Sequence, residues 1–225
     1  MFTNREEAGR QLGVRLEHLK TDPGAGVVVL GLPRGGVVVA AQIAMALGAP
    51  LDVLVVRKLG APTQPELAIG AVTDGEHPQR ILNRRVIASL RVGAEYLEQE
   101  AARQLQEVKR CQSLYRGDRP SVSLSGRTVV VVDDGIATGA TVRAGVQALR
   151  QAPVARIVLA VPVAPQVALE MLGDQVDELV CLETPLVFPA VGSFYVDFRQ
   201  TTDAEVIALL EERGAGAQGR RGEGG

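Results

Sequence analysis

Apolar residues follow two different spacings along this chain. Short apolar runs rich in β-branched residues are typical of strands buried on both faces of a sheet. They occur at residues 27–30, 51–56, 129–132, 156–161 and 178–182. Elsewhere, apolar residues recur every three or four positions, which is typical of helices packed on one side. These segments are 2–19, 39–47, 84–111, 141–149, 166–172 and 203–210. The alternation of the two spacings predicts an α/β protein with an open, mainly parallel sheet.

The run Val129–Val132 leads into the strongest candidate for a functional site, because Asp133, Asp134 and a loop of small residues follow it. Ligands of parallel α/β sheets bind beyond the carboxyl ends of the strands. A Gly/Thr-rich loop at a helix N-terminus presents backbone N–H groups that bind phosphate. Two carboxylates beside such a loop would repel a bare phosphate, so ribose hydroxyls or Mg²⁺ are their expected partners. A plainer interpretation is that the aspartates cap the next helix.

A second glycine loop, Leu32-Pro33-Arg34-Gly35-Gly36, connects the first strand to a helix. It lacks the Gly-Lys-Ser/Thr ending of a nucleotide P-loop. Arg34 can bind diphosphate oxygens with a planar fork, while the glycines allow the backbone to approach closely. Alternatively, the glycines serve only helix packing and Arg34 faces water.

The strand at 51–56 ends in Arg57-Lys58, and lysine otherwise occurs only at positions 20 and 109. A compact ammonium can stabilise negative charge that develops on a leaving group. The alternative is a charged pair exposed to solvent. Residues 60–65 contain two prolines and predict irregular structure, whereas 67–72 and 80–82 predict a hairpin that turns at Asp74-Gly75.

The long helical pattern at about 84–112 is an insertion that the basic fold does not need, and Gly93 is the expected point of a break. We expect it to pack across the sheet, to cover the site, or to contact a second subunit of a homo-oligomer. We expect the fourth strand to end at Pro162, and Thr3 or Asn4 to cap the first helix. Residues 1–213 are interpreted as a single domain, and 214–225, rich in Gly and Arg, as a disordered tail.

Composition narrows the class of protein. The 225 residues are 46% hydrophobic and 22% charged, with a net charge of −2, so we expect no nucleic-acid or anionic-membrane partner. Cys111 and Cys181 lack CxxC spacing and are typical of reduced thiols in a cytoplasmic protein. Neither a signal peptide nor an apolar run long enough for a membrane span is visible. His18 and His77 predict no metal site.

The stretch VVVVDDGIATGAT, residues 129–141, resembles the 13-residue motif of type I phosphoribosyltransferases, which bind phosphoribosyl pyrophosphate (PRPP). The resemblance implies an open, mainly parallel sheet with helices on both faces and a small hood, here about 184–198. It also implies Mg²⁺-dependent transfer of the phosphoribosyl group of PRPP to a small nitrogenous, nucleobase-like acceptor, with release of pyrophosphate, in nucleotide metabolism.

The resemblance assigns roles to particular residues. Asp133 and Asp134 hold the ribose hydroxyls and, with Lys58, form the catalytic set. The 5′-phosphate loop consists of Ala137, Thr138, Gly139, Ala140 and Thr141. The pyrophosphate site consists of Arg34, Gly35, Arg57 and Lys58. The base site consists of Phe188 and Val191. The Mg²⁺ site is Asp133, Asp134 and Asp197, with the ion bound mainly through substrate or water.

Two questions stay open at this stage. The residue before Thr138-Gly139 is Ala137, whereas 6-oxopurine enzymes of the resembled family have an aspartate there, so hypoxanthine and guanine are disfavoured as acceptors. The aromatic run near Phe188 either stacks on a base or closes the domain as a hydrophobic clasp. A PRPP-binding regulatory protein with little catalysis is the alternative function.

Overall fold

The computed structural model describes the chain except for residues 22–23, 25, 74–79 and 219–225. Five parallel strands form the larger sheet, in the order β2-β1-β6-β7-β8. Their bounds are β1 Val27–Gly31, β2 Leu51–Val53, β6 Thr128–Val132, β7 Arg156–Val163 and β8 Glu178–Glu183. The open parallel sheet predicted from the sequence is therefore confirmed.

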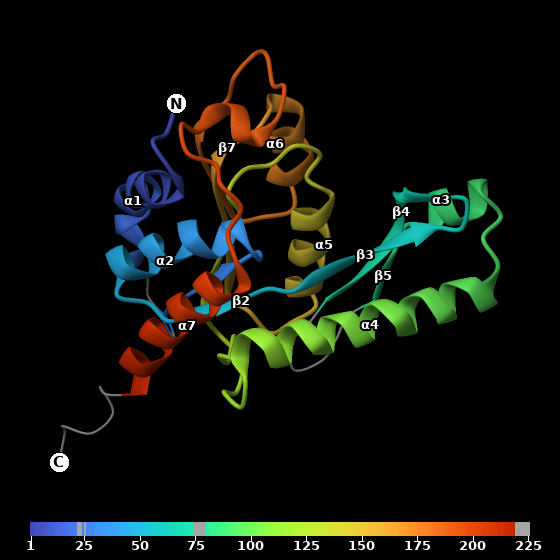
Figure 1. Ribbon diagram of the computed structural model, residues 1–225, viewed down its shortest axis with the longest axis horizontal. Helices are drawn as coiled ribbons and strands as arrows, with labels where there is room; N and C mark the ends of the chain where they lie inside the picture. The colour runs from blue at the N-terminus through green and yellow to red at the C-terminus, as the bar shows by residue number, and fades with distance from the viewer. Residues whose placement is uncertain (22–23, 25, 74–79, 219–225) are drawn as a thin grey trace.

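Helices cover both faces of this sheet (Figure 1). They are α1 Arg5–Arg15, α2 Gly35–Leu47, α5 Ala140–Leu149, α6 Gln166–Gly173 and α7 Asp203–Gln218. Along β6, Val130 and Val132 pack with α1, α2 and α7, whereas Val129 and Val131 pack with α5 and α6. Because both faces of β6 are buried, the strand needs an unbroken apolar run and shows no alternation.

A second, antiparallel sheet has the order β3-β4-β5, with bounds β3 Val56–Ala61, β4 Gln64–Thr73 and β5 Arg80–Leu82. The expected strand at 51–56 is therefore split, since β2 ends at Val53 and β3 belongs to the other sheet. The expected pairing of 67–72 with 80–82 is confirmed, and its turn lies outside the described residues. The expectation of irregular structure at 60–65 is confirmed only for the turn at residues 62–63, because β3 continues to Ala61 and β4 starts at Gln64. The register shifts around Gly60, so Pro65 lies outside the regular ladder and removes no ladder hydrogen bond.

The helical insertion forms α3 Arg84–Ser89 and α4 Ala94–Arg116, with Gly93 as the N-cap of α4, as the sequence predicts. Helix α4 packs along the smaller sheet and ends beside the larger one (Figure 1). There the guanidinium of Arg116 donates to the buried carboxylate of Asp52 (Nε to Oδ1, 2.8 Å). The same carboxylate accepts the backbone N–H groups of Val53 and Val122. One apolar cluster continues from the larger sheet to the smaller one.

Three boundaries differ from the sequence-based expectations. Strand β7 continues through Pro162, because β6 ends opposite Ala160 and leaves one side of β7 without a ladder partner. Helix α7 extends to Gln218, so residues 214–218 of the expected tail are helical, and 219–225 lie outside the described residues. The first helix is shorter than expected and is followed by the 3₁₀ helix η1, Glu17–Thr21. Within the described residues, no helix is long and apolar enough to cross a membrane.

Candidate functional site

The loop after β6 leads directly into α5 and exposes the start of that helix. Gly139 is the N-cap residue, with a φ of 72° that favours glycine, and no side chain caps α5. Ala137, Thr138 and Thr141 are exposed. The first backbone N–H groups of α5 therefore face outward without a side-chain acceptor, which is the arrangement that binds phosphate at a helix N-terminus.

The two aspartates after β6 are held by several hydrogen bonds. The Asp134 N–H donates to Asp133 Oδ1 at 2.9 Å, and the Tyr195 hydroxyl donates to the Asp134 carbonyl oxygen at 2.6 Å. The Asp134 carboxylate accepts Arg5 Nε at 2.7 Å. The backbone and carboxylate of Asp134 are therefore both fixed from outside the motif.

Arg5 was not predicted as a site residue. It is the first residue of α1, whose N-cap is Asn4, as the sequence predicts; the Asn4 side chain accepts the Glu7 N–H. The Arg5 side chain is only 10% exposed, donates to the Arg199 carbonyl oxygen at 2.8 Å, and lies 3.9 Å from the centroid of the Phe198 ring. A cation in the first turn of a helix is disfavoured by the helix dipole, and this anomaly was the available signal of a tertiary role.

The surroundings of the aspartate pair change the pKa of Asp133. Burial and the negative charge of Asp134 raise the pKa of Asp133 above its ordinary value, while the Asp134 N–H and the Arg5 guanidinium oppose this rise. The raised pKa shows that a second negative charge is poorly compensated by the protein alone. Such a site favours hydrogen-bond donors, such as hydroxyl groups, or a cation next to the carboxylates.

The loops after β1 and β6 share one cavity of about 390 Å³. Its lining includes Arg34, Gly35, Asp133, Asp134 and Phe198. A Cβ on Gly35 would overlap the Asp134 carboxylate and come within 2.7 Å of Arg5 Nε, so only glycine allows this close approach. The Arg34 guanidinium lies at the rim, 4.0 Å from Asp203 Oδ1. The cavity thus combines two carboxylates with two arginines, Arg5 and Arg34, beside the carboxyl ends of neighbouring strands.

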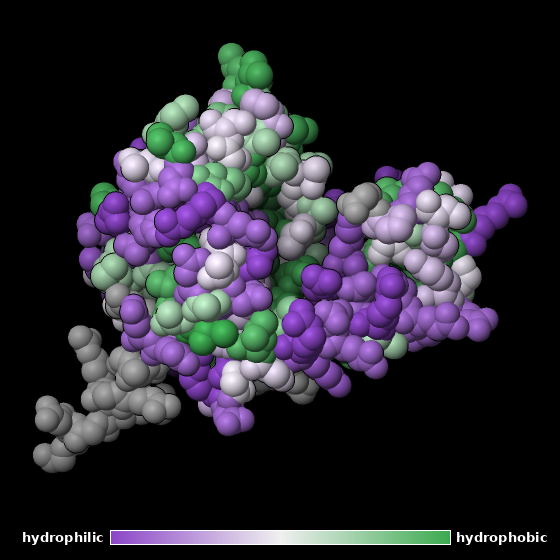
Figure 2. Space-filling view, in the orientation of Figure 1, coloured by the Kyte–Doolittle hydropathy of each residue, from purple (hydrophilic) through white to green (hydrophobic). Residues whose placement is uncertain are grey.

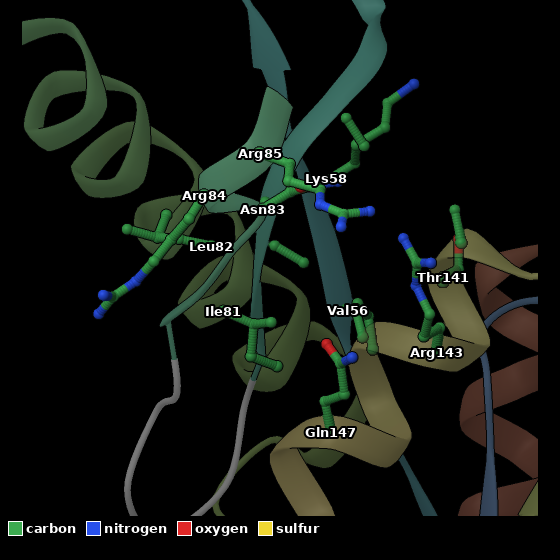
Figure 3. Close-up of a pocket in the computed structure, with 15 residues that line it drawn as sticks. Val56, Lys58, Ile81, Leu82, Asn83, Arg84, Arg85, Thr141, Arg143 and Gln147 are labelled. Carbon is green, nitrogen blue, oxygen red and sulfur yellow. The ribbon is translucent and has the colours of Figure 1, made fainter. Parts of the chain in front are cut away.

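Arg57 and Lys58 lie elsewhere, on β3 of the smaller sheet. Arg57 Nε donates to the Gln104 side chain of α4 at 3.4 Å. Lys58 lines a second cavity, of about 470 Å³, between the smaller sheet and α5 (Figure 3). The two described cavities have no lining residue in common. The structure therefore brings Arg34 and Gly35 to the aspartates, but not Arg57 and Lys58.

Comparison with known proteins identifies the family. The profile of the phosphoribosyl transferase domain matches residues 15–199. This chain belongs to the phosphoribosyl transferase family. The resemblance stated from the motif is thereby confirmed.

Relatives of this phosphoribosyl transferase domain match nearly all of the chain. Two Mycobacterium tuberculosis proteins, named "Putative phosphoribosyl transferase Rv0571c" and "Putative phosphoribosyl transferase MT0597", are each 48% identical over 211 residues. The match covers 94% of this chain but 46% of either relative, so the chain spans about half the length of these curated relatives. The crystal structure of TT1426 from Thermus thermophilus is similar with a TM-score of 0.82 and 44% identity, covering 94% of this chain and 98% of that one.

The hood-like segment of this phosphoribosyl transferase domain forms an aromatic cluster. Phe188 stacks on Phe194, with 5.2 Å between ring centroids, and Tyr195 contacts both Phe2 and Phe198. Val191, in the 3₁₀ helix η2 Val191–Phe194, lies directly against Gly135. Neither Phe188 nor Val191 lines the two cavities described above, so their assignment to a base stays a prediction.

Asp197 does not join the aspartate pair. Its carboxylate accepts the Arg199 N–H at 3.0 Å and forms an ion pair with the Arg199 guanidinium. Within the described residues, no three acidic, histidine or cysteine side chains gather as a metal-binding group. The expected set of Asp133, Asp134 and Asp197 is therefore not assembled as direct ligands. Binding of Mg²⁺ through substrate and water, the main route expected from the sequence, remains a prediction.

Proposed function

We propose that this protein transfers the phosphoribosyl group of PRPP to a nitrogenous, nucleobase-like acceptor and releases pyrophosphate. The observation that carries this proposal is the cavity in which Asp133, Asp134, Arg34 and Gly35 meet at the carboxyl ends of β1 and β6. The adjoining start of α5 adds a phosphate-binding group. A ligand with hydroxyls between a phosphate and a diphosphate matches this order of groups.

In this proposal, the ribose hydroxyls of PRPP donate hydrogen bonds to Asp133 and Asp134. Arg5 holds the Asp134 carboxylate in place and acts as a positioning residue. The residues of the loop from Ala137 to Thr141 bind the 5′-phosphate through backbone N–H groups and threonine hydroxyls. Departure of pyrophosphate builds positive charge on the sugar and negative charge on the leaving group. The aspartates lie on the side of the sugar and Arg34 on the side of the pyrophosphate.

The pyrophosphate site is proposed to include the backbone of Gly35 and the Arg34 fork, because both residues line the aspartate cavity and a guanidinium binds phosphate oxygens with paired hydrogen bonds. Arg57 and Lys58 would join this site only if the smaller sheet came closer to Arg34. Mg²⁺ suits the oxygen donors present here, and when bound it would neutralise pyrophosphate oxygens. Asp133 and Asp134 would hold it through water and the substrate.

The acceptor is proposed to be a nucleobase-like heterocycle other than a 6-oxopurine. Ala137 offers no carboxylate to a base nitrogen, which supports this exclusion. Phe198 lines the cavity beside the aspartates, and Phe188 and Val191 lie in the neighbouring hood-like segment. Aromatic faces there would suit a planar ring.

The test replaces Asp133 and Asp134 together with asparagine. Wild-type protein is incubated with PRPP, Mg²⁺ and a panel of bases, and released pyrophosphate is measured. We expect release with at least one acceptor, and a loss of at least about 100-fold in the double variant, by analogy with the loss of a preorganised electrostatic group. Asp118→Asn, at an exposed loop position, is the matched control and should leave turnover unchanged. Full turnover in the double variant would refute the assignment.

A PRPP-binding regulatory protein with little catalysis is the second candidate. Lys58 lines a separate cavity and Arg57 contacts Gln104 of α4, which supports this candidate, because sensing of PRPP needs no group to stabilise a leaving pyrophosphate. Calorimetry separates the two candidates. Binding of PRPP without pyrophosphate release for any acceptor would favour the sensor, whereas turnover with one acceptor would favour the enzyme.

A further inference from the structure

The larger cavity, of about 470 Å³, lies between α5 and the smaller sheet. Ala140 and Thr141 of the proposed 5′-phosphate loop belong to its lining, whereas Arg85, Arg143 and Gln147 have no role in the proposed transfer. The space-filling view shows the hollow between the main body and the arm built from α3, α4 and the smaller sheet (Figure 2). Its volume is in the range of small-molecule sites. It extends along α5 from Ala140 to Gln147, which is about two turns of the helix.

The charge of this cavity is one-sided. Lys58, Arg84, Arg85 and Arg143 all line it, and none of the described lining residues is acidic. Figure 3 shows the Arg85 side chain reaching from the start of α3 toward α5, where the Arg143 guanidinium lies opposite. In the described part of the chain, neither Arg85 nor Arg143 forms an ion pair or a side-chain hydrogen bond. Two like charges that face each other across a hollow repel, and an anion between them would remove that repulsion.

The floor of the cavity is apolar and its polar groups are few. Val56, Ile81, Leu82 and Ala144 supply aliphatic surface, and Figure 3 shows the Gln147 amide pointing into the space above it. Ligand sites commonly combine an apolar lining with a few well-placed polar groups that fix orientation. A purely inorganic anion would leave this apolar surface uncovered. The lining therefore fits a molecule with an apolar, planar body and one anionic group.

We propose that this cavity is a second binding site, separate from the aspartate cavity, for a planar small molecule that carries a carboxylate or a phosphate. Arg85 and Arg143 bind the anionic group from opposite sides, since guanidinium groups match both anions with paired hydrogen bonds. The body of the ligand lies on the apolar floor, and Gln147 hydrogen-bonds its edge. The ligand thereby joins the smaller sheet to α5.

The experiment uses the full chain and isothermal titration calorimetry with three probes of one shape: 1-naphthoate, 1-naphthyl phosphate and neutral 1-naphthamide. We expect saturable binding of at least one anionic probe at one site per chain, and affinity for the amide at least roughly tenfold weaker, as for loss of a hydrogen bond to a charged group. The stronger of the two anions tells whether the site prefers a carboxylate or a phosphate. Equal affinity for all three probes would overturn the proposal.

Variants tie the binding to this cavity. Arg85→Gln and Arg143→Gln should each weaken the anionic probe roughly tenfold or more. Arg10→Gln is the matched control, because Arg10 is an exposed residue of α1 that does not line this cavity. The affinity of this variant should stay within about twofold of wild type, as expected for a surface change. Unchanged affinity in both Arg85→Gln and Arg143→Gln would overturn the proposal, provided that circular dichroism shows each variant folded.

Competition separates this inference from the proposed function. The anionic probe should bind equally well with saturating PRPP and Mg²⁺ present, and in the Asp133→Asn, Asp134→Asn double variant. Displacement by PRPP would show that the cavity belongs to the PRPP site and would overturn a separate site. If the protein binds no PRPP at all, the proposed function fails, while probe binding that depends on Arg85 and Arg143 would still support this cavity.

Discussion

Arg5→Gln tests whether the first turn of α1 holds the aspartate site together. The substitution removes the guanidinium that donates to Asp134 and to the Arg199 carbonyl oxygen. It also removes the cation lying on the Phe198 ring. The variant should lose stability and bind PRPP more weakly, because the Asp134 carboxylate then lacks its counter-charge.

The size of the effect follows from the burial of the pair. Removing one partner of a buried ion pair costs about 3–5 kcal/mol. The side chains of Arg5 and Asp134 are 10% and 17% exposed, so water partly screens the carboxylate that is left. We therefore expect the lower end, a loss of about 3 kcal/mol in the free energy of unfolding. For a chain of this length, that corresponds to a fall in melting temperature of roughly 6–12 °C.

Urea unfolding followed by circular dichroism measures this loss, and calorimetry measures PRPP affinity. Arg5→Lys keeps the charge but cannot reproduce the planar fork, so it should lie between wild type and Arg5→Gln. Arg10→Gln, an exposed position on the same helix, should change stability by less than about 0.5 kcal/mol. If Arg5→Gln unfolded with wild-type free energy and bound PRPP normally, the anchoring role of Arg5 would be refuted.

Three further substitutions test other parts of the structure. Because the pKa of Asp133 is raised above 3.8, the folded state binds its proton more tightly than the unfolded chain, so stability falls as pH rises through the folded pKa. Asp133→Asn should remove that fall, and urea unfolding at a series of pH values measures it. Identical pH profiles of stability for wild type and the variant would contradict the reasoning. Gly35→Ala should cost about 1–3 kcal/mol by crowding Asp134 and should weaken PRPP binding. Asp52→Asn should cost about 3 kcal/mol, because the buried Arg116 loses its counter-charge, and a thermal melt measures it.

The matched control for Gly35→Ala is Gly173→Ala, where a Cβ would meet nothing within 4 Å. Equal stability of the two alanine variants would contradict the close approach at Gly35. For Asp52→Asn, the control is Asp118→Asn at an exposed position. A melting temperature for Asp52→Asn equal to that of this control would show that the contact between α4 and β2 contributes little.

Sequence patterns predicted the parts of the fold in which local preference and tertiary environment agree. The valines of β6 favour a strand by themselves and lie where both faces are buried. Gly93 was predicted to interrupt the insertion because it is a poor helix former, and α4 starts there. Local preference and structure also agree in the loop of the motif, since Gly139 takes a left-handed conformation, which glycine favours, immediately before α5.

Tertiary context decided the parts that were missed. Proline usually indicates the end of a strand. Pro162 and Pro65 nevertheless lie within strands, at positions where the neighbouring strand needs no backbone N–H donor. The division of 51–56 between two sheets depends on pairing with distant residues, which local spacing does not encode. Arg5 is 128 residues from Asp133 in the sequence, so only the folded chain reveals their relation.

The aspartate site draws on both ends of the described chain. Phe2 pairs with Tyr195 through backbone hydrogen bonds, and Arg5 reaches the segment that includes Arg199. Because ribosomes make a chain from the N-terminal to the C-terminal side, α1 emerges before Tyr195, Phe198 and Arg199, which complete its contacts with the site. A nascent chain released just after α5 would carry the whole PRPP motif without the tyrosine and the aromatic ring that complete its surroundings. Ligand binding should therefore appear only when synthesis has passed about residue 201, as domains generally fold as units.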